Sequence, residues 1–123
     1  MQKMKRRDVG ILGENIAKYF LEKKGYRIIE TNYWSPEGEI DIIAKHGDFL
    51  VFVEVRTKTS LEFGSPEESI TPAKMERLKA TAAYYQQTHS NLLPQWRIDV
   101  VAIELNKGKV SRIEVIENAV SDS

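Results

Sequence analysis

Two apolar runs separated by a short polar turn constrain the fold of this chain more than any other feature. The runs, 39–45 and 49–58, are rich in β-branched residues and flank His46-Gly47-Asp48. Runs of this length and composition predict strands, and the glycine-containing turn between them predicts a β-hairpin. The second run begins with consecutive apolar residues, which is typical of a central strand covered on both faces.

A capped helix follows this hairpin and is itself followed by two more strands. Thr71 is suited to the N-cap and Pro72 to the first helical position, and the helical pattern continues to about Thr88. We expect strands at 96–105 and 110–117, joined by a turn that contains Gly108. A helix between the third and fourth strands permits a crossover connection, and therefore a mixed sheet.

The N-terminal part predicts one more helix and one more strand. Asp8 is expected to cap a helix that runs to about Lys24 and ends before Gly25, with a strand at 26–34. The predicted order is α-β-β-β-α-β-β, an α/β fold with a mixed central sheet and flanking helices. We expect one domain, 1–123, with a basic arm at 1–7 and a frayed tail at 118–123.

Composition narrows the classes of function. The 123-residue chain has no cysteine, which excludes a disulfide framework, a thiolate zinc site and a cysteine nucleophile. It also fits a reducing compartment, so we expect a cytoplasmic protein. No apolar run approaches the ~20 residues that span a bilayer, so no membrane association is expected.

The charges of the chain give evidence both for and against binding to nucleic acid. The formal net charge is zero, which counts against avid non-specific binding to nucleic acid. The N-terminus is nevertheless basic and free of acids: Lys3, Lys5, Arg6 and Arg7. Such an arm can steer a protein toward phosphate, or it can simply be a solvated tail.

Asp41 and Glu54 interrupt the two apolar runs with carboxylates. Both lie six to seven residues from the hairpin tip, so a tight turn would place them nearly opposite each other. An ionised carboxylate in an apolar strand is costly unless it is paired, and one or two carboxylates with water commonly hold Mg²⁺. Two interpretations stay open: a divalent-metal site, or pairing of Glu54 with Arg56 or Lys58 while Asp41 ends its strand.

Several other polar residues are ambiguous from sequence alone. Lys74 is at the third helical position, where it can contact a phosphate or remain a surface lysine. Glu39 shares a face with Asp41 if the strand alternates regularly. Glu14 reads as solvated, and Arg97 and Asp99 predict a buried cross-strand ion pair. His46 and His89 have no metal-ligand spacing.

A set of motifs in a fixed order carries a resemblance to a known family. The chain resembles the YraN-like family of uncharacterised bacterial proteins from the first helix through the fourth strand. That family is similar to the PD-(D/E)xK nucleases with the restriction-endonuclease-like fold, and to archaeal Holliday-junction resolvases. The motifs are Gly13-Glu14, Gly25-Tyr26, Asn32, Gly38-Glu39-Ile40-Asp41-Ile42-Ile43-Ala44, Phe52-Val53-Glu54-Val55-Arg56-Thr57-Lys58, Phe63-Gly64, Lys74 and Arg97-Ile98-Asp99-Val100-Val101.

The resemblance implies an activity and a role for each residue. It implies Mg²⁺- or Mn²⁺-dependent hydrolysis of DNA phosphodiester bonds, with branched or structured DNA as a candidate substrate and a homodimer as a candidate assembly. Asp41 and Glu54 would bind the metal, and Arg56 would occupy the position of the family lysine. The accessory residues would be Glu14, Glu39 and Lys74.

Two departures from the superfamily pattern bear on catalysis. Ile40 precedes Asp41 where the pattern has proline, and Arg56 stands where it has lysine. Arginine stays protonated, so it cannot readily act as a general base, although it can hold a phosphate. Lys58, two residues further on the same face, could replace it. The alternative function is a non-catalytic nucleic-acid-binding or assembly module.

Overall fold

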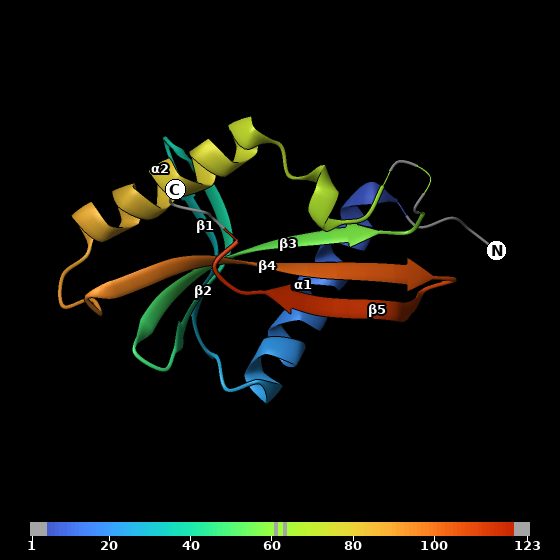
Figure 1. Ribbon diagram of the computed structural model, residues 1–123, viewed down its shortest axis with the longest axis horizontal. Helices are drawn as coiled ribbons and strands as arrows, with labels where there is room; N and C mark the ends of the chain where they lie inside the picture. The colour runs from blue at the N-terminus through green and yellow to red at the C-terminus, as the bar shows by residue number, and fades with distance from the viewer. Residues whose placement is uncertain (1–4, 61, 63, 120–123) are drawn as a thin grey trace.

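The computed structural model describes residues 5–60, 62 and 64–119 (Figure 1). The described residues confirm the predicted order of helices and strands and add a short 3₁₀ helix, η1. None of their helices is long and apolar enough to cross a bilayer. The elements are α1 (Arg6–Lys23), β1 (Arg27–Ser35), β2 (Gly38–His46), β3 (Phe49–Lys58), η1 (Glu67–Ser69), α2 (Pro72–Thr88), β4 (Gln95–Asn106) and β5 (Lys109–Ile116).

The strands form one mixed sheet in the order β1-β2-β3-β4-β5. Short turns join β1 to β2, β2 to β3 and β4 to β5, so these pairs are antiparallel. The segment with η1 and α2 joins β3 to β4, and this crossover makes the central pair parallel. The sequence prediction of a mixed α/β sheet is therefore confirmed.

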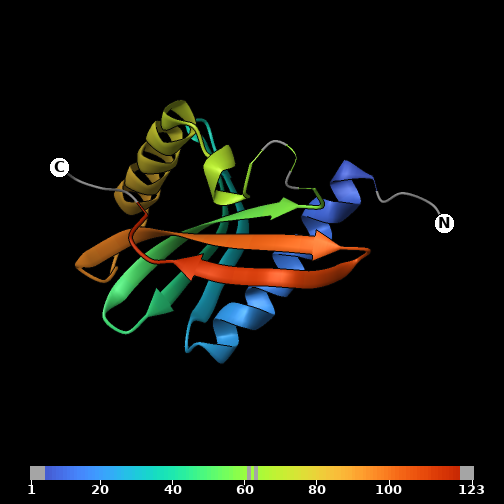
Figure 2. The same cartoon turned by 45° about the vertical axis from the view of Figure 1, so that its right-hand side comes forward.

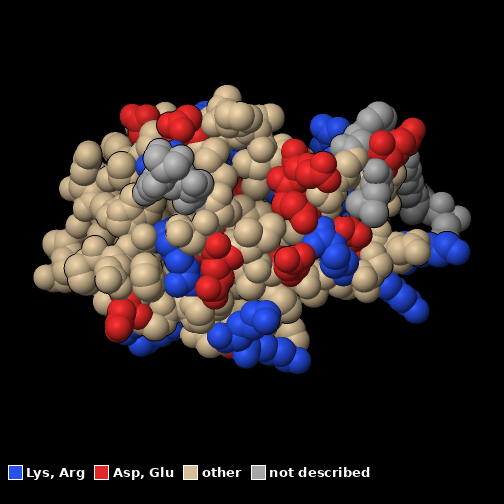
Figure 3. Space-filling view, in the orientation of Figure 1, with Lys and Arg blue, Asp and Glu red and all other residues tan. Residues whose placement is uncertain are grey.

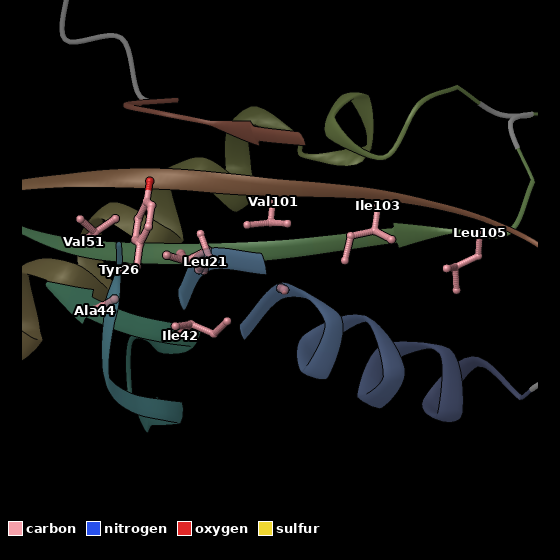
Figure 4. Packing of buried hydrophobic residues seen from close by; sticks show 10 residues of the cluster. Leu21, Tyr26, Ile42, Ala44, Val51, Val101, Ile103 and Leu105 are labelled. Atoms are coloured by element: carbon pink, nitrogen blue, oxygen red, sulfur yellow. The ribbon is translucent and has the colours of Figure 1, made fainter. Parts of the chain in front are cut away.

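One helix covers each face of the sheet. Figure 4 shows the α1 side, where Leu21 of α1 lies among Tyr26, Ile42 and Val101, all buried. On the opposite face, α2 packs mainly on β2 and its neighbours. The buried members of this second cluster are Ile40, Ile43, Leu50, Phe52, Leu78, Ala82, Tyr85 and Ile98. Both faces of β3 are thus buried, as its apolar start predicts.

The helix ends differ in how well they match the sequence prediction. Lys74 N–H donates to Thr71 Oγ1 at 3.1 Å, which confirms the N-cap of α2. Asp8 lies in the first turn of α1, not at its N-cap, so that prediction is wrong. Because α1 begins at Arg6, Arg6 and Arg7 belong to the helix and not to a separate arm. Lys3 lies outside the described residues.

The last described residues return to the sheet. The backbone N–H of Asn118 donates to Asp99 Oδ1 at 2.9 Å, and that of Ala119 donates to the carbonyl of Ile98 at 2.8 Å. These two residues are therefore held against β4, where the sequence predicted a frayed tail. The remainder of that tail, 120–123, lies outside the described residues.

The sheet forks between β2 and β3. Their pairing runs from His46↔Phe49 to Ile42↔Val53 and then stops. Beyond this point β2 stays paired with β1, whereas β3 stays paired with β4 as far as Lys58. Figure 2 shows β1 and β2 running at a steep angle to β3, β4 and β5. The fork leaves one edge of β3 without a neighbouring strand.

Candidate active site

Asp41 and Glu54 lie at the branch point of this fork. They are the next residues of β2 and β3 after the last ladder pair, Ile42↔Val53. Asp41 Oδ2 accepts a hydrogen bond from Val55 N at 2.8 Å, so its carboxylate takes the place of a strand partner. The structure therefore brings together the two acids that the hairpin register predicted.

Strand alternation breaks at Asp41. Ile42 belongs to the cluster on the α1 side, but Ile40, two residues away, belongs to the cluster on the α2 side. β1 is irregular at the same level, because Asn32 lies opposite the break and has a left-handed φ of 53°. Asparagine adopts this conformation more readily than most residues. The paired irregularity turns the end of the β1–β2 hairpin away from β3.

Glu54 is a buried acid with two cations beside it. It is 5% exposed, and its Oε2 lies 3.1 Å from Arg56 Nε and 3.6 Å from Lys74 Nζ. Burial and the neighbouring charge of Asp41 raise the pKa of Glu54 to about 7, although Lys74 and Arg56 act in the opposite direction. Near neutral pH, the Glu54 carboxyl group can therefore be either protonated or ionised.

Arg56 is incompletely satisfied in this arrangement. Its Nε is buried and, among the described residues, has no hydrogen-bond acceptor in good geometry, despite the proximity of Glu54. The side chain is 31% exposed and lines a cleft. The exposed part of the Arg56 side chain, and not its buried Nε, can therefore donate hydrogen bonds to an anion that enters this cleft.

Glu14 reaches the site because α1 lies unusually close to β3. A Cβ on Gly13 would lie 2.0 Å from Thr57 Oγ1, so only glycine permits this approach. Partial burial and the charge of Asp41 raise the pKa of Glu14, and a hydrogen bond from Asn32 opposes the rise. Glu14 is therefore not simply a solvated residue; it is electrostatically coupled to Asp41.

An open cleft of about 740 Å³ runs along the free edge of β3. It contains Asp41 and two of the predicted cations, Arg56 and Lys58. Lys74 and Glu39 line a separate, smaller pocket of about 190 Å³ under α2. The residues of the larger cleft are Arg6, Val9, Gly10, Glu14, Asp41, Val55, Arg56, Thr57, Lys58, Thr59, Ser60 and Ser69.

Sequence reasoning missed three residues that shape this site. Arg6 lines the larger cleft, Arg77 lines the smaller pocket, and Asn32 forms the irregularity opposite Asp41. Asn32 was named only among the family motifs, and an asparagine inside a run of β-formers was the signal for its irregularity. Arg6 was named only as part of a basic arm that could steer the protein toward phosphate, and Arg77 looks like an ordinary surface residue in the sequence.

The donor set at the fork fits a hard divalent cation. Among the described residues no group of three or more histidine or acidic side chains converges in ligand geometry. Two adjacent carboxylates nevertheless suffice for Mg²⁺, which usually keeps several of its waters. Asp41 and Glu54 would be the protein ligands, and Glu14 lines the same cleft as Asp41.

The Arg97–Asp99 pair lies outside this site. The two residues are neighbours on β4, with Nε to Oδ1 2.9 Å apart, so the predicted ion pair forms but is not cross-strand. Asp99 also accepts from Tyr26 Oη at 2.7 Å, and Tyr26 stacks on His46. This network connects β4 with Tyr26, which precedes β1, and with His46 at the end of β2, so we assign it a structural role.

A family profile described as "Uncharacterised protein family UPF0102" matches residues 13–103. The chain belongs to the UPF0102 family. The match includes the acids and cations of the fork, from Glu14 to Lys74, and the Arg97–Asp99 pair.

Individual UPF0102 proteins resemble the chain over nearly its whole length. The UPF0102 protein of Moorella thermoacetica is 45% identical over 117 residues, covering 94% of this chain and 98% of the relative. That of Dehalococcoides mccartyi is 44% identical over 117 residues, covering 95% and 96%. That of Renibacterium salmoninarum is 44% identical over 107 residues, covering 87% and 91%.

Proposed function

We propose that this UPF0102 protein is a restriction-endonuclease-like, Mg²⁺-dependent nuclease that hydrolyses DNA phosphodiester bonds, with branched or structured DNA as the candidate substrate. The observation that carries the proposal is the fork, where Asp41 and Glu54 meet beside a cationic cleft. The charge of Asp41 helps to raise the pKa of Glu54, and two neighbouring carboxylates repel each other unless a proton or a cation lies between them.

A divalent cation on these acids would lower the pKa of bound water and neutralise charge on the phosphate (Mn²⁺ would serve the same role). The chain's own contribution is to place cations around the reacting phosphate. Arg56 is suited to hold a non-bridging oxygen, because its side chain is partly exposed and lines the cleft next to Glu54. Lys58 lines the same cleft and is the lysine available to accept or donate a proton.

The charge distribution favours a small nucleic-acid-binding site at the cleft over an extended surface that binds nucleic acid non-specifically. Figure 3 shows acidic and basic side chains interspersed over the face on view, with no continuous basic surface. The net charge of zero agrees with this picture. Affinity should therefore come from a few contacts at the cleft and not from a broad electrostatic footprint.

The direct test is a cleavage assay on labelled single-stranded, linear duplex and four-way-junction DNA with Mg²⁺ or Mn²⁺. We expect cleavage by the wild type, and loss of at least about a hundredfold in Asp41→Asn and Glu54→Gln. Asp48→Asn is the matched control, because Asp48 is exposed in the turn at the other end of the same hairpin. Equal cleavage by Asp41→Asn and wild type would rule out the proposed site.

A specific observation favours a second candidate, a nucleic-acid-binding or assembly module without catalysis. Arg56 and Lys74 already neutralise Glu54, and arginine replaces the lysine typical of the superfamily. Calorimetry with Mg²⁺ and a DNA-binding titration in EDTA distinguish the two functions. DNA binding with neither metal binding nor turnover would favour the module, and light scattering of the same samples would test the expected homodimer.

A further inference from the structure

The outer edge of β5 has no partner strand among the described residues. β5 is the last strand of the sheet, and all its ladder pairs are with β4 on the other side (Figure 1). Ser111 is an extra residue near its start, where the register with β4 shifts by one. Bulges, lysines and prolines commonly protect an edge strand from pairing with another chain. The segment 112–116 has none of these features, so its edge is available for pairing.

An open groove of about 480 Å³ lies between β5 and α1, and most of the residues that line it are apolar. α1 packs mainly on β3, so it leaves the same face of β5 partly uncovered. Tyr19 and Val110 line the groove and are 63% and 44% exposed, next to the half-buried Phe20 and Ile113. The groove therefore presents apolar side chains directly beside the free edge of the sheet.

The exposed apolar side chains of the chain concentrate at this place. Ile11 is exposed and lies two turns before Tyr19 on the same side of α1. Three of the six exposed large apolar residues that the structure describes, Ile11, Tyr19 and Val110, are thus on α1 and β5, whereas the other three are on β1 and β4. A grouping of exposed apolar residues beside an unpaired edge is typical of a surface that binds another protein.

The two faces of β5 differ in chemistry. Ile113 and Val115 pack against the cluster on the α1 side. Arg112 is on the other face, where its guanidinium donates to Glu67 of η1 and to Glu114, both at 2.7 Å. Along its edge, the strand therefore offers apolar side chains on one face and one charge of each sign on the other.

The positions of these charges restrict how two copies of β5 can pair. A two-fold axis normal to the sheet relates two antiparallel copies, so residues of the same face meet. An axis at Arg112 or at Glu114 places that residue opposite its own copy, with like charges together. An axis at Val115 places the apolar Ile113 opposite the charged Glu117. An axis at Ile113 instead places Arg112 opposite Glu114 of the partner subunit, on both sides of the axis, so charge complementarity selects this register.

We propose that β5 pairs with β5 of a second copy of this chain about a two-fold axis at Ile113, and that this pairing covers the apolar groove of each copy. The axis is normal to the sheet, so both α1 helices lie on the same face of one continuous sheet. The interface is isologous, because the same surface of each copy meets its equivalent. The inference is independent of the proposed nuclease activity, because none of the groove residues lines the larger cleft.

A single cysteine tests the register, because the chain has no cysteine of its own. Directly opposite strand residues have Cβ atoms about 4.5–5.5 Å apart, close to the separation in a disulfide, so the thiols of Ile113→Cys meet at the axis. Oxidised glutathione should convert this variant into a covalent dimer on a non-reducing gel. Lys109→Cys is the control, because its more exposed thiol lies roughly 25 Å from its copy in this register. Random collisions would instead cross-link Lys109→Cys at least as fast.

Sedimentation velocity over a series of protein concentrations, without DNA or divalent metal, tests the groove. We expect the wild type to dimerise and Tyr19→Ala to weaken dimerisation by about tenfold or more, because a tyrosine buried at an interface contributes strongly to affinity. Trp34→Ala is the matched aromatic control, because Trp34 is 68% exposed but lies on β1, at the opposite end of the strand order. Its effect should be less than about twofold. Circular dichroism confirms that each variant folds.

The outcomes separate this interface from the catalytic proposal. Cross-linking of Ile113→Cys but not of Lys109→Cys, with weaker dimerisation in Tyr19→Ala alone, supports the β5 interface even if no DNA is cleaved. A wild type that stays monomeric at its highest soluble concentration overturns it. Equal cross-linking of the two cysteine variants, or equal dimerisation of Tyr19→Ala and Trp34→Ala, also overturns it, even if cleavage depends on Asp41.

Discussion

The carboxylate of Asp41 accepts the backbone N–H of Val55 at 2.8 Å, so a side chain of β2 stands where a backbone carbonyl would continue the ladder. This contact defines the fork, because β2 and β3 pair only up to Ile42↔Val53. It also orients one carboxylate oxygen and leaves the other for a ligand.

Replacement of Asp41 should separate its structural and chemical roles. Asp41→Asn keeps an oxygen acceptor for Val55 N–H, whereas Asp41→Ala leaves this donor without a partner. We expect Asp41→Ala to be less stable than Asp41→Asn by about 1–2 kcal/mol, and both to lose cleavage. Urea unfolding in EDTA measures the difference, with Asp48→Ala, expected within about 0.5 kcal/mol of wild type, as the control. Equal stability of the two Asp41 variants would show that the Val55 contact is unimportant.

The pKa of Glu54 makes stability depend on pH in a stated direction. The folded-state pKa of about 7 exceeds the ordinary value of 4.5, so between these pH values the native state binds more protons than the unfolded chain. The contribution of Glu54 to the free energy of unfolding is complete below about pH 4.5. It decreases as the pH rises toward 7, by roughly 3 kcal/mol at most. Glu54→Gln should remove this component when unfolding is measured in EDTA at pH 5 and pH 8.

The exposed Glu76 offers the control for this experiment. Its side chain is 72% exposed and pairs only with Lys79 among the described residues, so Glu76→Gln should leave the pH profile of stability unchanged. An identical pH profile for Glu54→Gln and wild type would contradict the raised pKa.

Arg56 should contribute to cleavage through its positive charge and its hydrogen-bond donors. Arg56→Gln removes a cation from Glu54 and a donor from the cleft, so we expect cleavage to fall by about a hundredfold or more. It should also raise the pKa of Glu54 further, which extends the pH-dependent loss of stability above pH 7. Arg56→Lys retains the charge and should stay within about tenfold of wild type. Equal activity of Arg56→Gln and wild type would remove Arg56 from the site.

The pairing of Asp41 with Glu54 could be predicted from sequence because it depends on local features. The two-residue turn at Gly47-Asp48, between the paired residues His46 and Phe49, fixes the register of the hairpin, and the register fixes which residues meet. The break in alternation could not be predicted in the same way. It depends on Asn32 in the adjacent strand, and thus on a pairing that the sequence of β2 alone does not specify.

Two sequence predictions failed, and the second of them failed because a distant partner completes the network. Asp8 is a good N-cap residue by type, yet α1 begins at Arg6, two residues earlier. Asp99 was expected to find its partner across a strand, but the fold gives it Arg97 from its own strand and Tyr26 from 73 positions away. Such contacts appear only once the sheet and α1 are assembled.

Substitution of two glycines of α1 with alanine should change the stability of the protein in opposite directions. Gly13→Ala would place a Cβ 2.0 Å from Thr57 Oγ1, so α1 must move away from β3, with a loss of about 1–3 kcal/mol and weaker cleavage. Gly10 has no neighbouring atom within 4 Å of such a Cβ, so Gly10→Ala should stabilise the helix by about 0.5–1 kcal/mol. Thermal unfolding compares the two. The double variant Gly13→Ala with Thr57→Ala should recover part of the loss, and no recovery would contradict this contact.

Asp99 should be the most sensitive polar residue for stability, although it lies far from the fork. It is fully buried and accepts from Arg97, Tyr26 and the backbone of Asn118, so Asp99→Asn leaves Arg97 without its buried counter-charge. We expect a loss of about 3–5 kcal/mol in urea unfolding. Glu117 is the control: it lies 3.8 Å from the same arginine but is 55% exposed, so Glu117→Gln should cost less than about 1 kcal/mol. Similar losses in the two variants would mean that burial does not set the strength of this network. Cleavage per folded molecule should be unchanged in both, because neither residue lines the cleft.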